Sequence, residues 1–212
     1  MNREAMLETV RVALGRKPAQ AIDKPPSVYL PVVTSSMEQR ITLFTAALEE
    51  LAGRVIRCSS GETACDRVRS LIAGKRAIAS SAPYLKACGI TDLDNVASEF
   101  DDAEAYRQAC AEADAGITSA DYALADTGTL VMISGAEESR LVSLLPPTHI
   151  AVVPVSRLIE NLDELLLRIP TPADRTSSLV LITGPSRTAD IEQILVRGVH
   201  GPGEITVILV DE

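Results

Sequence analysis

The sequence predicts an α/β domain with a mostly parallel, doubly wound sheet that carries an antiparallel element. Helix-type and strand-type patterns alternate along the chain with short connections, which is typical of parallel α/β folds. Apolar runs over residues 148–154 and 177–183 are typical of buried strands. Residues 116–134 hold two β-rich runs around a turn, which favours a hairpin. With 212 residues, the chain is long enough for one well-buried domain, which we expect over residues 35–212.

Residues 1–34 are expected to form an N-terminal helix followed by a proline-rich strap. Met6, Leu7, Val10 and Leu14 stand at helical spacing over residues 3–15. Four prolines between residues 18 and 31 disfavour helix and favour an extended segment. Such a strap could lie across the domain or reach a partner subunit. An oligomer could therefore form through contacts of the N-terminal arm.

The first half of the domain is predicted as helices and strands in turn. The helix over residues 36–53 should bury Ile41, Phe44, Leu48 and Leu51 and use Gly53 as its C-cap. The expected order continues with strand 54–58, helix 63–74, strand 75–80, a loop with one helical turn over 81–90, strand 96–100 and helix 101–114.

The second half begins with the hairpin over residues 116–134, whose turn contains Asp126, Thr127 and Gly128. A helix over residues 156–169 should turn Ile159, Leu162, Leu165 and Leu166 inward. The other predicted elements are helix 139–145, strand 148–154, strand 177–183, a short helix that ends near Gly198, and strand 204–212.

The composition disfavours nucleic-acid and membrane partners. The 20 Lys and Arg against 29 Asp and Glu give a net charge of −9, so a nucleic acid or an anionic bilayer would be repelled on average. The sequence has no apolar run of membrane-spanning length, and its N-terminus mixes charges into the apolar positions. We therefore expect a cytoplasmic protein.

The cysteines do not have the spacing of a metal site. Cys58, Cys65, Cys88 and Cys110 are widely separated, with no C-x-x-C pair, and neither histidine is near a cysteine in sequence. We expect free, mostly buried thiols, no metal and no cofactor.

One candidate anion site is the loop after strand 177–183. Gly184, Ser186 and Thr188, followed by a helix, would place free backbone N–H groups and a helix N-terminus at the carboxyl edge of the sheet. Arg187 could bind a carboxylate or phosphate, and Asp190 could cap the helix or hold a substrate hydroxyl. The alternative is an ordinary strand-to-helix turn, which uses the same residue types.

A second candidate is the turn Asp126-Thr127-Gly128-Thr129. Gly128 allows close backbone approach, and the two threonines offer hydroxyls beside Asp126, so the turn could cradle a small acid or a phosphate. A turn between two strands needs much the same residues.

Three further residues are weaker candidates. Arg140 starts a helix after the glycine-containing, acidic segment 134–139, which could act as a lid. His149, at the mouth of strand 148–154, could act as an acid or base, and His200 lies in a loop of glycines and proline. For each of them a structural role is the alternative.

The sequence resembles the LUD-domain family, whose best-known members are lactate-utilisation proteins. The resemblance rests on GITSADYALADTGTLVMIS (116–134), RLVSLLPPTHIAVVP (140–154) and ITGPSRTADIEQILVRGVHGPGEITVILVDE (182–212), and it covers about residues 35–212. Asp126 stands where many relatives have Glu. The resemblance implies a fold similar to that of ribose-phosphate isomerases, CoA transferases and 5-formyltetrahydrofolate cyclo-ligases.

The resemblance also implies a role in oxidising L-lactate to pyruvate beside iron–sulfur partner proteins, and it names no catalytic residue. Because this chain lacks cysteine-rich cluster motifs, we expect a non-redox subunit or accessory factor. Two alternatives are a stand-alone enzyme acting on a phosphorylated, CoA-linked or folate-like small molecule, and a regulatory sensor of an organic acid.

Overall fold

The computed structural model describes residues 3–15, 17, 35–100, 102–135, 139–174, 176–188 and 196–211. The chain divides into two compact units, Met1–Val32 and Val33–Glu212. In the first unit, α1 (Arg3–Ala13) confirms the predicted N-terminal helix, and its side chains are exposed. The predicted strap lies outside the described residues apart from Lys17.

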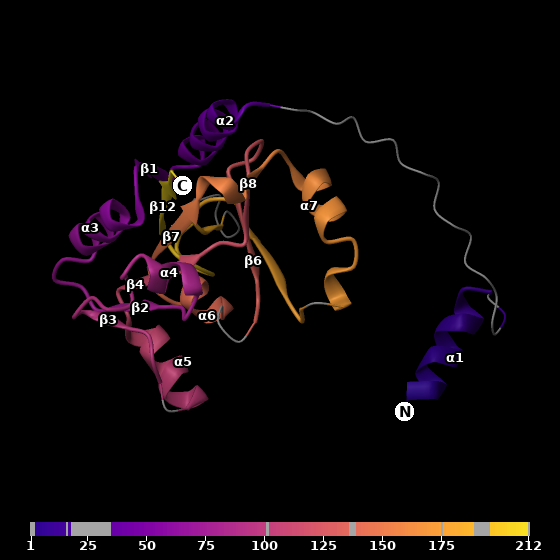
Figure 1. Cartoon of the computed structure of the whole chain (residues 1–212). Helices are drawn as coiled ribbons and strands as arrows, with labels where there is room; N and C mark the ends of the chain where they lie inside the picture. Colours follow the sequence, from indigo (N-terminus) through magenta and orange to yellow (C-terminus); the bar gives the residue numbers. More distant parts are fainter. Residues whose placement is uncertain are drawn as a thin grey trace. The chain divides into compact units, whose positions relative to one another are not determined.

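The second unit is built around a parallel sheet (Figure 1). The strands that the structure describes form six-stranded, four-stranded and two-stranded sheets. The six-stranded sheet has the order β1 (Arg54–Cys58), β12 (Glu204–Val210), β7 (Thr148–Pro154), β4 (Ala115–Ser119), β2 (Ala77–Ala79) and β3 (Val96–Ala97). Every described pairing within it is parallel, which confirms the predicted mostly parallel α/β fold.

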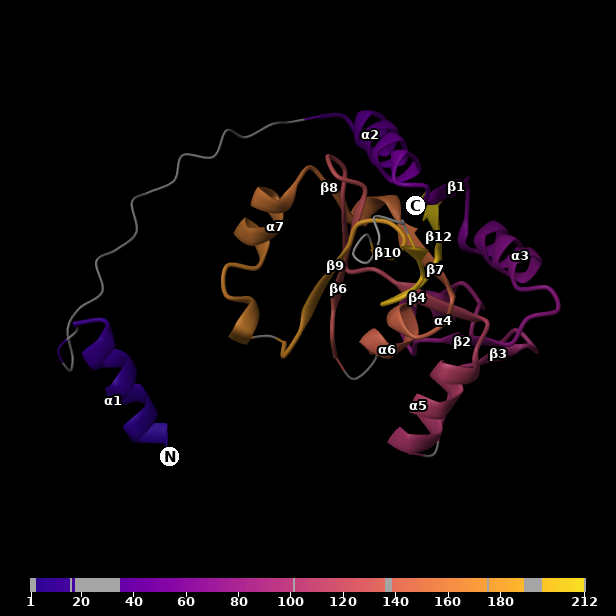
Figure 2. The ribbon, with the colours of Figure 1, turned by 180° about the vertical axis from the view of Figure 1, so that it is seen from behind.

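Helices cover both faces of this sheet, as Figures 1 and 2 show. On one face, α3 (Gly61–Leu71) and α4 (Pro83–Ala87) pack Val68 and Leu85 against Ile117 and Ile150. On the other face lie α2 (Met37–Glu50), α5 (Ala103–Glu112) and α6 (Arg140–Leu144).

Polar side chains set the starts of several helices. Ser36 and Gln39 form a reciprocal capping box on α2, and Ser60 caps α3 with Thr63. Asp102 accepts hydrogen bonds from two backbone N–H groups at the start of α5. These local signals explain why the predicted helices of the first half are found close to their expected positions.

A second sheet has the order β8 (Leu158–Ile159), β5 (Tyr122–Leu124), β6 (Thr129–Ile133) and β9 (Leu179–Ile182). One of its faces packs Ala123, Leu130 and Met132 into the core shared with the large sheet. Its other face is covered by α7 (Leu162–Arg168), which lies beyond β6 and β9 in both overall views (Figures 1 and 2).

The predicted hairpin over residues 116–134 proves to span two sheets. β5 and β6 are antiparallel around the expected turn, but β4 belongs to the parallel sheet. The chain changes sheet at Asp121, whose backbone N–H donates to the Val131 carbonyl and whose side chain accepts from the Ile133 N–H at 2.7 Å.

The predicted helix over residues 156–169 is wrong in its first part. A 3₁₀ turn (Val155–Arg157) and β8 come first, and α7 begins at Leu162 because the Asn161 side chain caps it through the Glu164 N–H. Ile159 and Leu165 are buried as expected, whereas Leu162 and Leu166 are 42% and 48% exposed.

Two smaller expectations are also corrected. Gly53 does not provide the left-handed residue after α2, because Ala52 has φ 64°. Gly53 is instead required for space, since a Cβ there would lie 2.6 Å from the Leu48 Cγ. β9 is half-buried rather than buried, because it lies at the edge of the four-stranded sheet with Leu181 exposed.

Candidate functional site

The structure brings two of the predicted loops together. The Thr129 hydroxyl lies 2.8 Å from the Thr127 hydroxyl and 2.8 Å from the hydroxyl of Thr183, the residue before Gly184. Thr127 also donates to the Asp126 carboxylate at 3.2 Å. A chain of hydrogen-bonding groups therefore joins the turn at 126–129 to the start of the 184–188 loop.

Both loops lie against the C-terminal end of α2. A Cβ on Gly128 would be 2.6 Å from the Leu48 nitrogen, and one on Gly184 would be 3.1 Å from the Leu51 Cβ. The Arg187 guanidinium donates to the Leu51 carbonyl, which is one of the acceptors left unpaired where α2 ends. Close packing explains both glycines, and Arg187 binds the end of this helix.

The 184–188 loop is not at the carboxyl edge of the parallel sheet. The strand that precedes the loop, β9, belongs to the sheet that contains antiparallel pairs. The Ser186 N–H donates at 2.8 Å to the carbonyl oxygen of Pro202, which lies just before β12 begins. The loop therefore lies near the amino edge, which removes the geometric reason for expecting an anion there.

The helix predicted after this loop is also corrected where the structure describes it. β10 (Arg187–Thr188) pairs with β11 (Val196–Arg197), so the residues before Gly198 form a strand. Asp190 and the rest of residues 189–195 lie outside the described residues. A ligand role for Gly184, Ser186, Arg187, Thr188 and Asp190 stays a prediction.

The two histidines occupy very different positions. His200 is exposed, and its backbone N–H donates to the Ser186 hydroxyl at 3.3 Å. His149 is fully buried, with Nε2 lying 2.8 Å from the Thr118 hydroxyl and with no partner for Nδ1 among the described residues. Burial lowers the pKa of His149 to about 4, so the ring is neutral near pH 7 and enclosed away from any substrate.

Arg140 is exposed at the first position of α6. The three residues at 136–138, in the predicted lid, lie outside the described residues. The lid and the ligand role of Arg140 therefore stay predictions.

A different group of polar side chains lies at the carboxyl edge of the parallel sheet. We call Tyr84, Ser119, Asp121 and Arg157 the carboxyl-edge cluster. Arg157, in the turn after β7, donates through Nη1 to the Ser119 hydroxyl at 3.0 Å and to the Ala120 carbonyl at 2.7 Å. Its Cζ lies 5.5 Å from the centroid of the Tyr84 ring, which comes from α4.

The charges in this cluster are only partly compensated. Burial raises the pKa of Asp121, while the Ile133 N–H and the charge of Arg157 act to lower it. Among the described residues, Arg157 has no ion-pair partner, whereas Arg40 is paired with Glu160 at 3.2 Å and Arg168 with Glu164 at 2.6 Å. Arg157 thus keeps a positive charge at this edge.

Two hollows open at the same edge, next to β2 and β3. They have volumes of about 470 and 410 Å³, and Ser81, Ser98 and Glu99 line both. The chain after β2 continues beside β4, because the Ser80 N–H donates to the Ile117 carbonyl at 3.0 Å. Ser81, which lines both hollows, therefore follows the strand next to β4, and β4 ends at Ser119 of the carboxyl-edge cluster.

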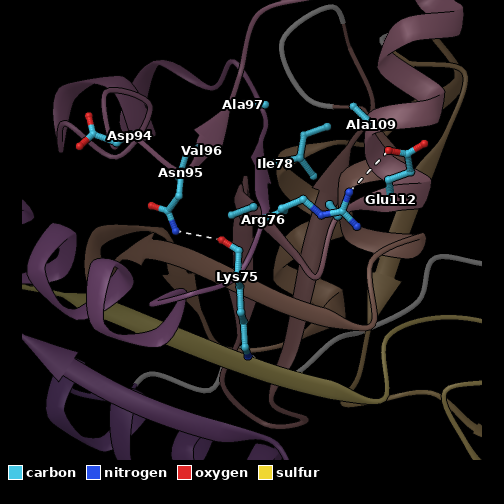
Figure 3. A pocket seen from close by; sticks show the side chains of 11 residues that line it. Lys75, Arg76, Ile78, Asp94, Asn95, Val96, Ala97, Ala109 and Glu112 are labelled. Atoms are coloured by element: carbon cyan, nitrogen blue, oxygen red, sulfur yellow. Dashed lines mark hydrogen bonds and ion pairs between the residues drawn. The ribbon is translucent and has the colours of Figure 1, made fainter.

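A further hollow of about 380 Å³ lies at the amino end of β2 (Figure 3). Arg76 is 3.6 Å from Glu112, and the Asn95 amide donates to the Lys75 carbonyl at 3.0 Å. The side chains of Arg76, Glu112 and Asn95 in this hollow are thus occupied by one another or by the backbone.

Sequence reasoning missed both the carboxyl-edge cluster and the buried pair of Arg40 with Glu160. Glu160 also accepts from the Ser35 hydroxyl at 2.7 Å; although burial opposes it, these partners lower the pKa of Glu160. For the cluster a signal exists, because Asp121 and Arg157 directly follow strands of the parallel sheet, where α/β folds place ligands.

Within the described ranges, no group of three His, Cys, Asp or Glu side chains could hold a metal ion. All four cysteines are buried. Among the described helices, none combines the length and apolar character needed to cross a membrane.

Comparisons with known proteins identify relatives over nearly the whole chain. The model of the LUD domain matches residues 41–210. The Lactate utilization protein C of Halalkalibacterium halodurans is 31% identical, covering 99% of this chain and 98% of that protein. The Lactate utilization protein C of Exiguobacterium sp. is also 31% identical, covering 100% and 96%.

A solved structure shows the same fold. The crystal structure of a DUF162 family protein from Deinococcus radiodurans has a TM-score of 0.64 at 19% sequence identity, covering 84% of this chain and 99% of that chain. Together with the match over residues 41–210, the relatives assign the sequence: the chain belongs to the LUD domain family.

Proposed function

We propose that this chain takes part in lactate utilisation, as a non-redox subunit or accessory factor in the oxidation of L-lactate to pyruvate. The observation that carries the proposal is the 31% identity over 99% of the chain to a protein named Lactate utilization protein C. The proposal assigns the chain to the cytoplasm.

The chemistry requires an electron acceptor. Oxidation of a 2-hydroxy acid to a 2-oxo acid releases two electrons and two protons, and in this proposal iron–sulfur partner proteins accept the electrons. Iron–sulfur clusters are usually held by several thiolates brought together. Here the four cysteines are buried, and among the described residues no three His, Cys, Asp or Glu side chains come together as metal ligands, so this donor set does not fit a cluster.

The first test is genetic and biochemical. Cells without this chain should fail to grow on L-lactate and still grow on pyruvate, because the block lies before pyruvate. The tagged chain, purified from lactate-grown cells, should bring down proteins with the visible absorption of iron–sulfur clusters. Normal growth of the deletion strain on L-lactate would refute the role.

The second test separates a subunit from an enzyme. The isolated chain should not reduce an artificial acceptor with L-lactate, whereas the complex with its partners should. Turnover by the isolated chain would show that it carries the redox chemistry itself. Thermal protection by phosphorylated or CoA-linked compounds, without any effect of lactate, would favour the stand-alone enzyme instead.

A further inference from the structure

We propose that the carboxyl-edge cluster is a binding site for a small 2-hydroxy acid, with Arg157 holding the carboxylate and Asp121 accepting a hydrogen bond from the 2-hydroxyl group. The choice of a 2-hydroxy acid rests on the proposed function. The location of the site rests on the geometry of the cluster alone.

Position is the first argument. Ser119 ends β4, Arg157 lies in the turn after β7, and Tyr84 follows β2 on α4. The strands β7, β4 and β2 are neighbours in the parallel sheet. Open α/β sheets bind their ligands outside the carboxyl ends of their strands, and here three segments converge at that edge.

The geometry of Arg157 is the second argument. Its two hydrogen bonds, to Ser119 and to the Ala120 carbonyl, both use Nη1, which fixes the guanidinium plane. Within the part of the chain that the structure describes, Nε and Nη2 donate no hydrogen bond. Two adjacent N–H donors on one edge of a guanidinium match the two oxygens of a carboxylate.

Charge is the third argument. Both acceptors of Arg157 are neutral oxygens, and the Tyr84 ring at 5.5 Å adds a favourable but uncharged contact. A half-buried guanidinium without an ion-pair partner among the described residues favours an anionic ligand. Arg168 provides the contrast, since it also stacks on a tyrosine, at 5.8 Å, but is paired with Glu164.

The carboxyl group of Asp121 is the reason for proposing a ligand with a hydroxyl group. Its Oδ2 accepts from the Ile133 N–H at 2.7 Å, and an ionised carboxylate has further lone pairs that could accept from a ligand. Burial and the charge of Arg157 act on this carboxyl in opposite directions. A hydroxyl that donates to Asp121 would distinguish a 2-hydroxy acid from a plain carboxylate of the same size, because the plain acid leaves the half-buried carboxyl without that partner.

Calorimetric titration of the full chain with L-lactate, propionate and the methyl ester of L-lactate tests the site. L-lactate should bind more tightly than propionate, and the uncharged ester should not bind. Arg157→Gln and Arg157→Lys should each weaken L-lactate binding at least about tenfold, since both lose the paired donors. Asp121→Asn should reduce the preference for L-lactate over propionate.

Two other variants serve as controls. Arg168→Gln removes an arginine that also stacks on tyrosine and should leave binding unchanged. Arg187→Gln tests the predicted loop at the opposite edge. Thermal unfolding checks that each variant is folded, and Arg157→Lys keeps the charge if Arg157→Gln proves unstable.

The outcomes separate the site from the proposed function. Absence of L-lactate binding to the wild-type chain, or loss of binding in Arg187→Gln but not in the Arg157 variants, would overturn the site. If the Arg157→Gln variant restored growth on L-lactate to cells that lack the wild-type chain, the site would also be overturned, while the role in lactate utilisation would remain. Binding through Arg157 in a chain that lactate growth does not require would retain the site and refute the function.

Discussion

The buried histidine gives a quantitative prediction about stability and pH. His149 in the folded chain has a pKa of about 4, because burial penalises its charged form, whereas the unfolded chain should titrate near 6.5. Between these values the unfolded state binds more protons, so stability rises with pH and is lost as the pH falls below about 6.5. Above that value the contribution is complete.

The linkage relation gives the size of the loss. For pKa values of 6.5 and about 4, the folded state should lose about 1 kcal/mol on going from neutral pH to near pH 5.5, and about 2–3 kcal/mol by near pH 4.5. His149→Gln removes the titration and can keep the hydrogen bond to Thr118. Its free energy of unfolding should therefore fall less over this range than that of the wild type.

Urea unfolding at several pH values from 7.5 to 4.5 measures the effect, with the difference between wild type and variant cancelling the acidic groups. His200→Gln is the matched control, because His200 is exposed, and its curve should follow that of the wild type. Parallel curves for wild type and His149→Gln would refute the reasoning. If the variant is unfolded, an NMR titration of the His149 ring in the wild type gives the folded pKa directly.

The other predictions concern packing and thiol access. Gly116→Ala places a Cβ 1.9 Å from the Val142 carbonyl oxygen, so urea unfolding should show a loss of about 1–3 kcal/mol or more. Gly135→Ala, with no described atom within 4 Å, should change stability by less than about 0.5 kcal/mol, and equal effects at the two glycines would contradict the packing. Leu48→Ala should lose about 2–5 kcal/mol because Leu48 is 0% exposed, while Leu43→Ala, at a position 49% exposed, should cost little. A similar loss in both leucine variants would mean that α2 presents a different face to the core. The four buried thiols should react with a thiol reagent far more slowly in buffer than in urea, and one fast thiol in buffer would show local opening there.

Much of the fold is predictable because its patterns are local. Strands β7 and β12 are found where continuous apolar runs predict them, since both are buried by neighbouring strands and by layers on both faces. The division into two sheets is not local. Nothing in residues 116–134 shows that the first run divides into β4, which pairs with β2 and β7, and β5, which pairs with β6 and β8, because strand pairing depends on distant segments.

Local sequence patterns are a poorer guide to the binding site than to the fold. Gly, Ser and Thr mark loops in general, and in the structure Thr127, Thr129 and Thr183 bond to one another. The spacing of Ile159 and Leu165 predicts a helix that includes Arg157, whereas the structure has a 3₁₀ turn there. Asn161 caps α7 and lies between this helix and β8. In the sequence it stands inside a single helical pattern, so its capping role is not evident there.

The position of β12 has a consequence for the order of folding. This strand pairs with both β1 and β7, joining Arg54 with Thr206 and Thr148 with Glu204. During synthesis, β1 must therefore wait for residues 204–210 before its place in the parallel sheet can be completed. Such distant pairing slows folding and leaves apolar strand edges exposed on the nascent chain, so this protein should depend on chaperones more than its size alone suggests.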